Sequence, residues 1–108
     1  MKIINSIRAS MLLGKGHKLL AKGRYQEALE KALKAKTLKL EEQFDWLCHL
    51  IEGKSRYHLG DRENALPCLR RAQQILAAKP AGERDSEPVQ NILNDIASYL
   101  EKIEQGDR

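Results

Sequence analysis

Histidine and cysteine are the side chains of this chain best suited to hold a metal ion. The candidates are Cys48, His49, His58 and Cys68. Adjacent residues of a helix point about 100° apart, so Cys48 and His49 do not share a face. Neither a CxxC pair nor another zinc-type spacing is present. The spacing therefore predicts no metal site and two reduced, partly buried thiols.

Motifs for catalysis are also missing from the sequence. There is no HExxH motif and no Ser-His-Asp set, and Gly14-Lys15-Gly16 lacks the strand and spacing of a phosphate-binding loop. The pair Glu41-Glu42 is better explained as favourable negative charge near a helix start. These observations predict a protein that is not an enzyme and uses no cofactor.

Charge divides unevenly along the chain. Residues 1–40 carry ten Lys and Arg against two Glu, a net +8, whereas residues 41–108 carry nine against thirteen Asp and Glu, a net −4. The basic part predicts an acidic partner, or head-to-tail contact between copies of the chain. Nucleic-acid binding is less favoured, because Tyr25 is the one aromatic residue of the basic part that could stack on a base.

Composition predicts an all-α fold. Aromatic residues make up 5% of the chain, and its apolar residues are mostly Leu, Ile and Ala, which favour helix. The length predicts one domain over residues 1–108. No apolar run is long enough for a membrane span or a signal-peptide core, which predicts a cytoplasmic protein. Five helices are expected, at Lys2–Ala21, Gln26–Lys39, Glu41–Leu59, Glu63–Ala78 and Glu87–Gln105.

An internal repeat is visible at an offset of 37 residues. It aligns Gly16 with Gly53 and Gly23 with Gly60, and it also aligns Ala28 with Ala65, Leu29 with Leu66 and Ala35 with Ala72. Two antiparallel helices approach closely where side chains are small. Gly23 and Gly60 are expected to end the first helix of each copy in the left-handed conformation. Each copy is therefore predicted to be a helix hairpin.

The last predicted helix has a single apolar stripe. Ser86 is placed to cap it, after a polar stretch punctuated by Pro80 and Gly82. A stack of hairpins needs a closing element at its end, because the last hairpin would otherwise expose its apolar face. The stripe predicts that this helix is the lid. Its members are Val89, Ile92, Leu93, Ile96, Leu100 and Ile103.

The repeat resembles the tetratricopeptide family, whose unit has a small residue in its first helix, Gly at the turn and Ala at two positions of its second helix. Gly16, Gly23, Tyr25, Ala28 and Ala35 carry the resemblance in the first copy, and Gly53, Gly60, Ala65 and Ala72 carry it in the second. It spans about residues 9–40 and 46–77, with 87–105 as the capping helix. The resemblance implies antiparallel hairpins stacked as a short right-handed superhelix. The longer period places three extra residues near Lys39–Gln43.

The resemblance also implies a function and a binding face. Tetratricopeptide-like proteins bind peptides or helices of other proteins on the concave face, lined by the first helix of each hairpin. We therefore expect an adaptor or small chaperone whose partner is a peptide or helix that bears a carboxylate. Homodimer formation and a nucleic-acid accessory role are the alternatives. The concave residues implied by the register are Leu13, His17, Leu20, Leu50, Lys54 and Tyr57.

Overall fold

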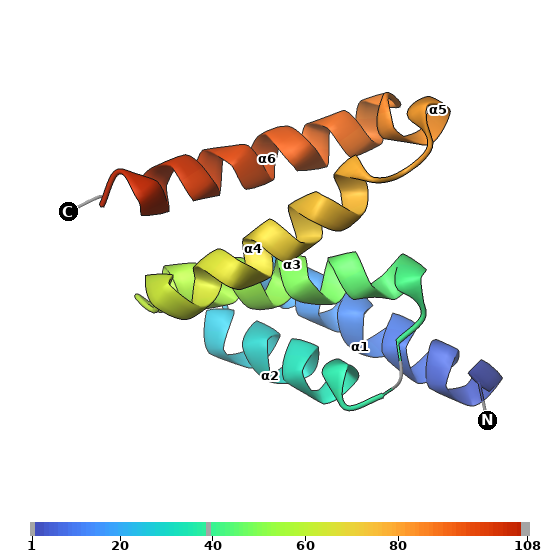
Figure 1. Ribbon diagram of the computed structural model, residues 1–108. Helices are drawn as coiled ribbons and strands as arrows, with labels where there is room; N and C mark the ends of the chain where they lie inside the picture. Colours follow the sequence, from blue (N-terminus) through green and yellow to red (C-terminus); the bar gives the residue numbers. More distant parts are fainter. Residues whose placement is uncertain (1, 39, 107–108) are drawn as a thin grey trace.

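The computed structural model in Figure 1 describes residues 2–38 and 40–106. These residues form an all-α fold, as predicted, with no strand. None of the helices in these ranges has the length and apolar character that spanning a bilayer requires. The helices are α1 (Lys2–Ala21), α2 (Tyr25–Lys36), α3 (Glu42–His58), α4 (Arg62–Ala77), α5 (Ala81–Arg84) and α6 (Glu87–Glu104).

The prediction of five helices was wrong, because the polar stretch before α6 contains the one-turn helix α5. Its turn closes on Pro80, whose carbonyl accepts hydrogen bonds from the amides of Glu83 (3.0 Å) and Arg84 (2.8 Å). Helix α1 has the predicted bounds, and the other long helices end within three residues of theirs. The predicted end of the second helix, at Lys39, lies outside the described residues.

Both hairpin turns are built in the same way. Gly23 has φ +78° and Gly60 has φ +88°, so both adopt the left-handed conformation predicted for them. The amide of Arg24 donates to the carbonyl of Leu19 at 2.9 Å, and the equivalent bond 37 residues later is 2.8 Å long. This bond satisfies a carbonyl that the helix end leaves unpaired. The sequence repeat is therefore a repeat of turn geometry.

Small residues set the distance between the helices of each hairpin. A Cβ added to Gly53 of α3 would lie 2.8 Å from Leu69 Cγ and 3.2 Å from Cys68 Cβ of α4. A Cβ on Gly16 of α1 would lie 3.4 Å from Lys31 Cβ of α2. Lys31 and Cys68 are themselves 37 residues apart. The two hairpins thus have equivalent closest points, and the second is the tighter.

The core consists of two clusters that meet at α3. The first lies between α1, α2 and α3, and the second between α3, α4 and α6. All six residues of the predicted α6 stripe belong to the second cluster or pack against it, which confirms the stripe. Phe44 packs on the first cluster and Trp46 on the second. The buried members are Leu13, Ala28, Ala32, Ala35, Cys48 and Ile51 in the first, and Leu50, Leu69, Ala72, Leu76, Ile96 and Leu100 in the second.

The serial arrangement of the helices follows from these clusters. In Figure 1 the first hairpin lies at the bottom, α3 and α4 lie in the middle, and α6 lies across the top of α4. Helix α6 therefore covers one face of the second hairpin. Among the described residues, the first hairpin has no equivalent of α6. No helix of that part of the chain packs on the side of α1 that points away from α3.

The tight contact at Gly53 generates a stability prediction. We expect Gly53→Ala to lower the free energy of unfolding by about 1–3 kcal/mol, because the added methyl overlaps Leu69. Gly16→Ala is the matched control, since its closest contact is 3.4 Å and the gain in helix propensity, up to about 1 kcal/mol, offsets mild crowding. Urea unfolding followed by far-UV circular dichroism measures both. Equal stabilities for the two variants would contradict the close approach.

Candidate interaction surface and polar cluster

The three concave residues predicted in α1 differ in their accessibility. Leu13 is 0% exposed and belongs to the first core cluster, and Leu20 is half-buried and packs against the same cluster. His17 is exposed. Of the three binding residues predicted in α1, only the His17 side chain is therefore accessible to a partner.

The three residues predicted in α3 contact α6. Leu50 is 6% exposed and lies in the second core cluster with Ile96 and Leu100. Lys54 forms an ion pair with Asp95. The family register locates these positions relative to the hairpins but takes no account of where the last helix packs. The six predicted residues thus do not form an open groove, and their role in partner binding stays a prediction.

Tyr57, the last predicted residue, is part of an aromatic cluster that joins three helices. Its ring meets the Tyr99 ring edge-on, with centroids 5.1 Å apart. The rings of Tyr25 and His58 stack at 4.3 Å, and His58 Nε2 is 2.8 Å from the Tyr99 hydroxyl. Tyr25 comes from α2, His58 from α3 and Tyr99 from α6. The cluster therefore fastens α6 to the turn end of both hairpins.

A stripe of large apolar side chains remains exposed on α1. Ile4, Ile7 and Met11 are 48%, 55% and 57% exposed, at a spacing that puts them on one side of the helix. Helix α1 has 20 residues and α2 has 12, so α1 is longer by about 12 Å. Figure 1 shows the first turns of α1 extending past the end of α2. The stripe begins on this extension.

A groove of about 460 Å³ adjoins the stripe, between α1 and the C-terminal end of α2. Met11, Leu12 and Leu38 give it an apolar floor. Lysine and arginine side chains surround that floor, so the groove combines an apolar surface with positive charge. Its lining residues are Arg8, Met11, Leu12, Lys15, Lys34, Thr37 and Leu38.

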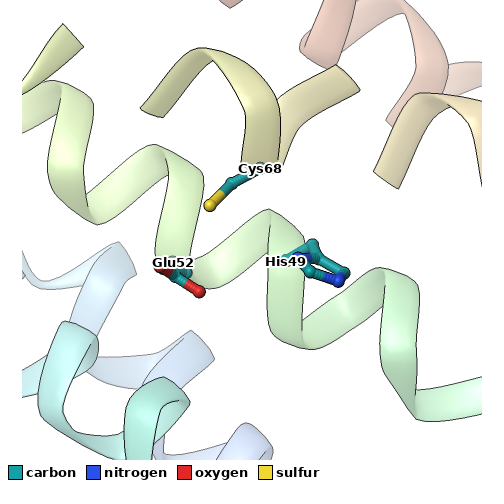
Figure 2. A group of neighbouring side chains, drawn as sticks. All are labelled: His49, Glu52 and Cys68. Atoms are coloured by element: carbon teal, nitrogen blue, oxygen red, sulfur yellow. The ribbon is translucent and has the colours of Figure 1, made fainter. Parts of the chain in front are cut away.

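A separate cluster of possible metal ligands lies between α3 and α4. One donor atom from each of His49, Glu52 and Cys68 lies within 4.8 Å of the other two. Figure 2 shows His49 and Glu52 on neighbouring turns of α3, with Cys68 reaching toward them from α4. The three side chains line an open pocket of about 290 Å³.

Glu52 is the only charged side chain that is buried among the described residues. Lys36 Nζ of α2 donates to its Oε1 at 3.2 Å, and Arg56 Nε donates to its Oε2 at 2.9 Å. Burial favours the protonated acid, but the hydrogen bond from Arg56 and the charge of Lys36 outweigh it and lower the pKa of Glu52. Glu52 is therefore a carboxylate at neutral pH.

The other two side chains of the cluster differ in charge and in pairing. Burial raises the pKa of the Cys68 thiol to about 12, and the negative charge of Glu52 adds to the rise. Cys68 is thus a thiol at neutral pH and a poor nucleophile. His49 Nε2 lies 3.2 Å from Asp45 Oδ1, whereas His49 Nδ1 is buried and has no hydrogen-bond partner in the described ranges.

This cluster was missed by the sequence analysis, which grouped histidines and cysteines by their spacing. The structure separates that set, because Cys48 Sγ donates to the Ala32 carbonyl in the core while His58 stacks on Tyr25. The signal available in the sequence was the three-residue spacing of His49 and Glu52, which puts both on one face of a helix. The contribution of Cys68 depends on packing between helices.

No known protein family, characterised protein or solved structure matches this chain.

The aromatic cluster predicts how stability depends on pH. His58 is exposed, but its ring is partly desolvated by its neighbours, which lowers the pKa of His58 from its ordinary 6.5, and the positive charges of Lys102 and Lys54 lower it further. The unfolded chain then binds a proton at a higher pH than the folded chain does. The stability that the neutral His58 ring contributes is therefore fully present above about pH 6.5. It is lost as the pH falls through the pKa of His58 in the folded chain.

His58→Phe is the variant that isolates this effect, because it keeps a ring against Tyr25 and removes the titrating group. We expect the wild-type chain to lose more stability than His58→Phe between pH 7 and pH 5, measured by urea unfolding at each pH. Parallel curves for the two proteins would show that His58 does not contribute in this way.

Proposed function

We propose that the chain is a tetratricopeptide-like interaction module, an adaptor or small chaperone, that binds an acidic amphipathic helix of a partner protein. The docking surface we assign is the first-hairpin surface, made of the exposed α1 stripe and the adjoining groove. This choice differs from the concave face implied by the family register, because α6 covers the α3 part of that face. The first-hairpin surface comprises Ile4, Ile7, Arg8, Met11, Leu12, Lys15, Lys34 and Leu38.

The proposal includes the fold type, a stack of tetratricopeptide-like hairpins. The repeated turn bonds, the equivalent close contacts at Gly16 and Gly53, and the serial packing of α1 to α4 support stacked tetratricopeptide-like hairpins. The right-handed superhelix is proposed from the resemblance. In such an array each hairpin buries its faces against its neighbours. The outer side of the first hairpin has no described neighbour, so it is available to a partner.

Apolar exposure is the observation that carries the proposal. Ile4, Ile7 and Met11 each expose about half of their surface, and Leu12 and Leu38 extend the apolar area into the groove. Fully burying a side chain of this size contributes about 1.5–3 kcal/mol. A helix that inserts its own apolar face into such a groove is a recurring mode of recognition.

Charge selects an acidic partner over a second copy of the same surface. Arg8, Lys15 and Lys34 border the groove, so carboxylates flanking an incoming apolar face would pair with them. Two copies joined through this surface would instead bring these cations together.

We also propose a cytoplasmic location. Both cysteines are free and buried, which agrees with the reducing environment of that compartment.

A pair of designed peptides tests the proposal directly. Both are helical with the same leucine stripe, and one has glutamate and the other lysine on its flanks. We expect the acidic peptide to shift the amide resonances of the first-hairpin surface in ¹⁵N-labelled protein. We expect the basic peptide to bind more weakly, with the difference shrinking as salt screens the charges.

Met11→Asp is the matching protein variant, since its side chain is exposed and its replacement leaves the core intact. We expect it to weaken binding of the acidic peptide at least about tenfold, which corresponds to 1.4 kcal/mol. Leu59→Asp is the control, because Leu59 is 44% exposed in the turn between α3 and α4, outside the surface. Equal losses in the two variants would contradict the assigned surface.

Two further outcomes would replace the proposal by its alternatives. A mass that rises with concentration in sedimentation, and that Met11→Asp keeps monomeric, would assign the surface to self-association. Binding to nucleic acid with a steep salt dependence, and no binding of either peptide, would assign the basic half to phosphate contacts.

A further inference from the structure

We propose that His49, Glu52 and Cys68 form a binding site for a zinc-type divalent cation, independent of the first-hairpin surface. The site would use His49 Nδ1, a Glu52 carboxylate oxygen and Cys68 Sγ, which are drawn from the two helices of the second hairpin. Nitrogen, oxygen and sulfur donors are those that zinc accepts. Three protein ligands with a fourth position open to solvent is also a common zinc arrangement.

The geometry of the three donors is close to what the ion requires. Bond lengths of 2.0–2.3 Å in a tetrahedral site place ligand atoms about 3.3–3.8 Å apart. One donor atom from each of the three side chains lies within 4.8 Å of the other two, so side-chain adjustments of about 1 Å would bring them to ligand distance. They line a pocket of about 290 Å³, which gives an ion access from solvent.

His49 is oriented as a metal-binding histidine usually is. Its Nε2 faces Asp45 Oδ1 at 3.2 Å, and a carboxylate at one ring nitrogen holds that nitrogen protonated and leaves the lone pair on the other. The other nitrogen, Nδ1, is buried and unpaired within the described part of the chain. An unpaired polar atom in a buried position is costly unless something binds it.

Glu52 is able to bind an ion while it keeps one of its present partners. A carboxylate has about four acceptor positions. Lys36, Arg56 and the Cys68 thiol each take one. Arg56 would keep its hydrogen bond to Glu52 and orient the carboxylate without contacting the ion. Lys36 competes with the ion for the carboxylate, and its half-exposed side chain (51%) can move away.

Cys68 would change its protonation state on binding. The ion forms a bond to sulfur, and the thiol proton leaves to solvent, because a coordinating thiol is deprotonated. No electron transfer or further reactant is involved. The second buried thiol, Cys48, faces the Ala32 carbonyl in the first core cluster, so it is a control thiol within the same chain.

Cobalt(II) is the probe that tests the assignment, because thiolate bound to cobalt gives a charge-transfer absorption that zinc then abolishes by displacement. We expect the full chain to show this band with one equivalent of cobalt, and Cys48→Ala and His17→Ala to retain it. We expect Cys68→Ser and His49→Gln to lose it while keeping their helical circular dichroism. Lys36→Gln should bind severalfold more tightly, because a competing cation is removed.

A second measurement does not depend on the thiolate spectrum. Zinc that binds the folded chain must raise its unfolding temperature, so we expect a rise in wild type and none in Cys68→Ser or His49→Gln. Absence of a charge-transfer band in the folded wild-type chain would overturn the proposal. A band that persists in Cys68→Ser, or one that disappears in Cys48→Ala, would overturn it as well.

Discussion

The close approach of α3 and α4 at Gly53 is the contact on which most of the structure depends. With no side chain at this position, Leu69 lies directly against the α3 backbone and fills the second core cluster. The same approach brings Cys68, the neighbour of Leu69, to the side of α3 that carries His49 and Glu52. The absence of a Cβ at Gly53 therefore permits both the apolar packing and the polar cluster. A wider separation of α3 and α4 would move all of these side chains apart.

The two ends of the helix array are treated differently. At one end α6 packs its apolar stripe on the second hairpin and adds the Lys54–Asp95 ion pair and the Tyr57–Tyr99 contact. At the other end the outer side of α1 exposes Ile7 and Met11. Hairpins of this type bury their faces only against neighbours. Among the described residues, α6 thus covers one end of the array and no helix covers the other, and the surplus of cations in residues 1–40 lies at that second end.

Much of the fold could be predicted because it is encoded locally. Gly23 and Gly60 marked the turns because few other residues adopt a positive φ, and the stripe from Val89 to Ile103 marked the buried face of α6 because its spacing is helical. The one-turn helix α5 was missed, since four residues carry too little periodicity to be recognised. The accessibility of Leu13 and Leu50 was also missed. A family register states which face a residue occupies, whereas burial depends on how closely α3 and α6 pack onto that face.

Glu52 shows why the polar cluster required three dimensions. Its partners come from α2, α3 and α4, in Lys36, Arg56 and Cys68. Arg56 lies four residues along the same helix, but no helical spacing connects Glu52 to Lys36 or Cys68. A buried carboxylate is expensive unless its oxygens are satisfied, so this position constrains the C-terminal parts of α2 and α3 and the first half of α4. An apolar residue of similar size would satisfy the core at less electrostatic cost. The Glu52 carboxylate therefore places a charge at the junction of the two hairpins, beside the Cys68 thiol and a histidine nitrogen that has no hydrogen-bond partner among the described residues, and that combination of donors is what an ion-binding role would use.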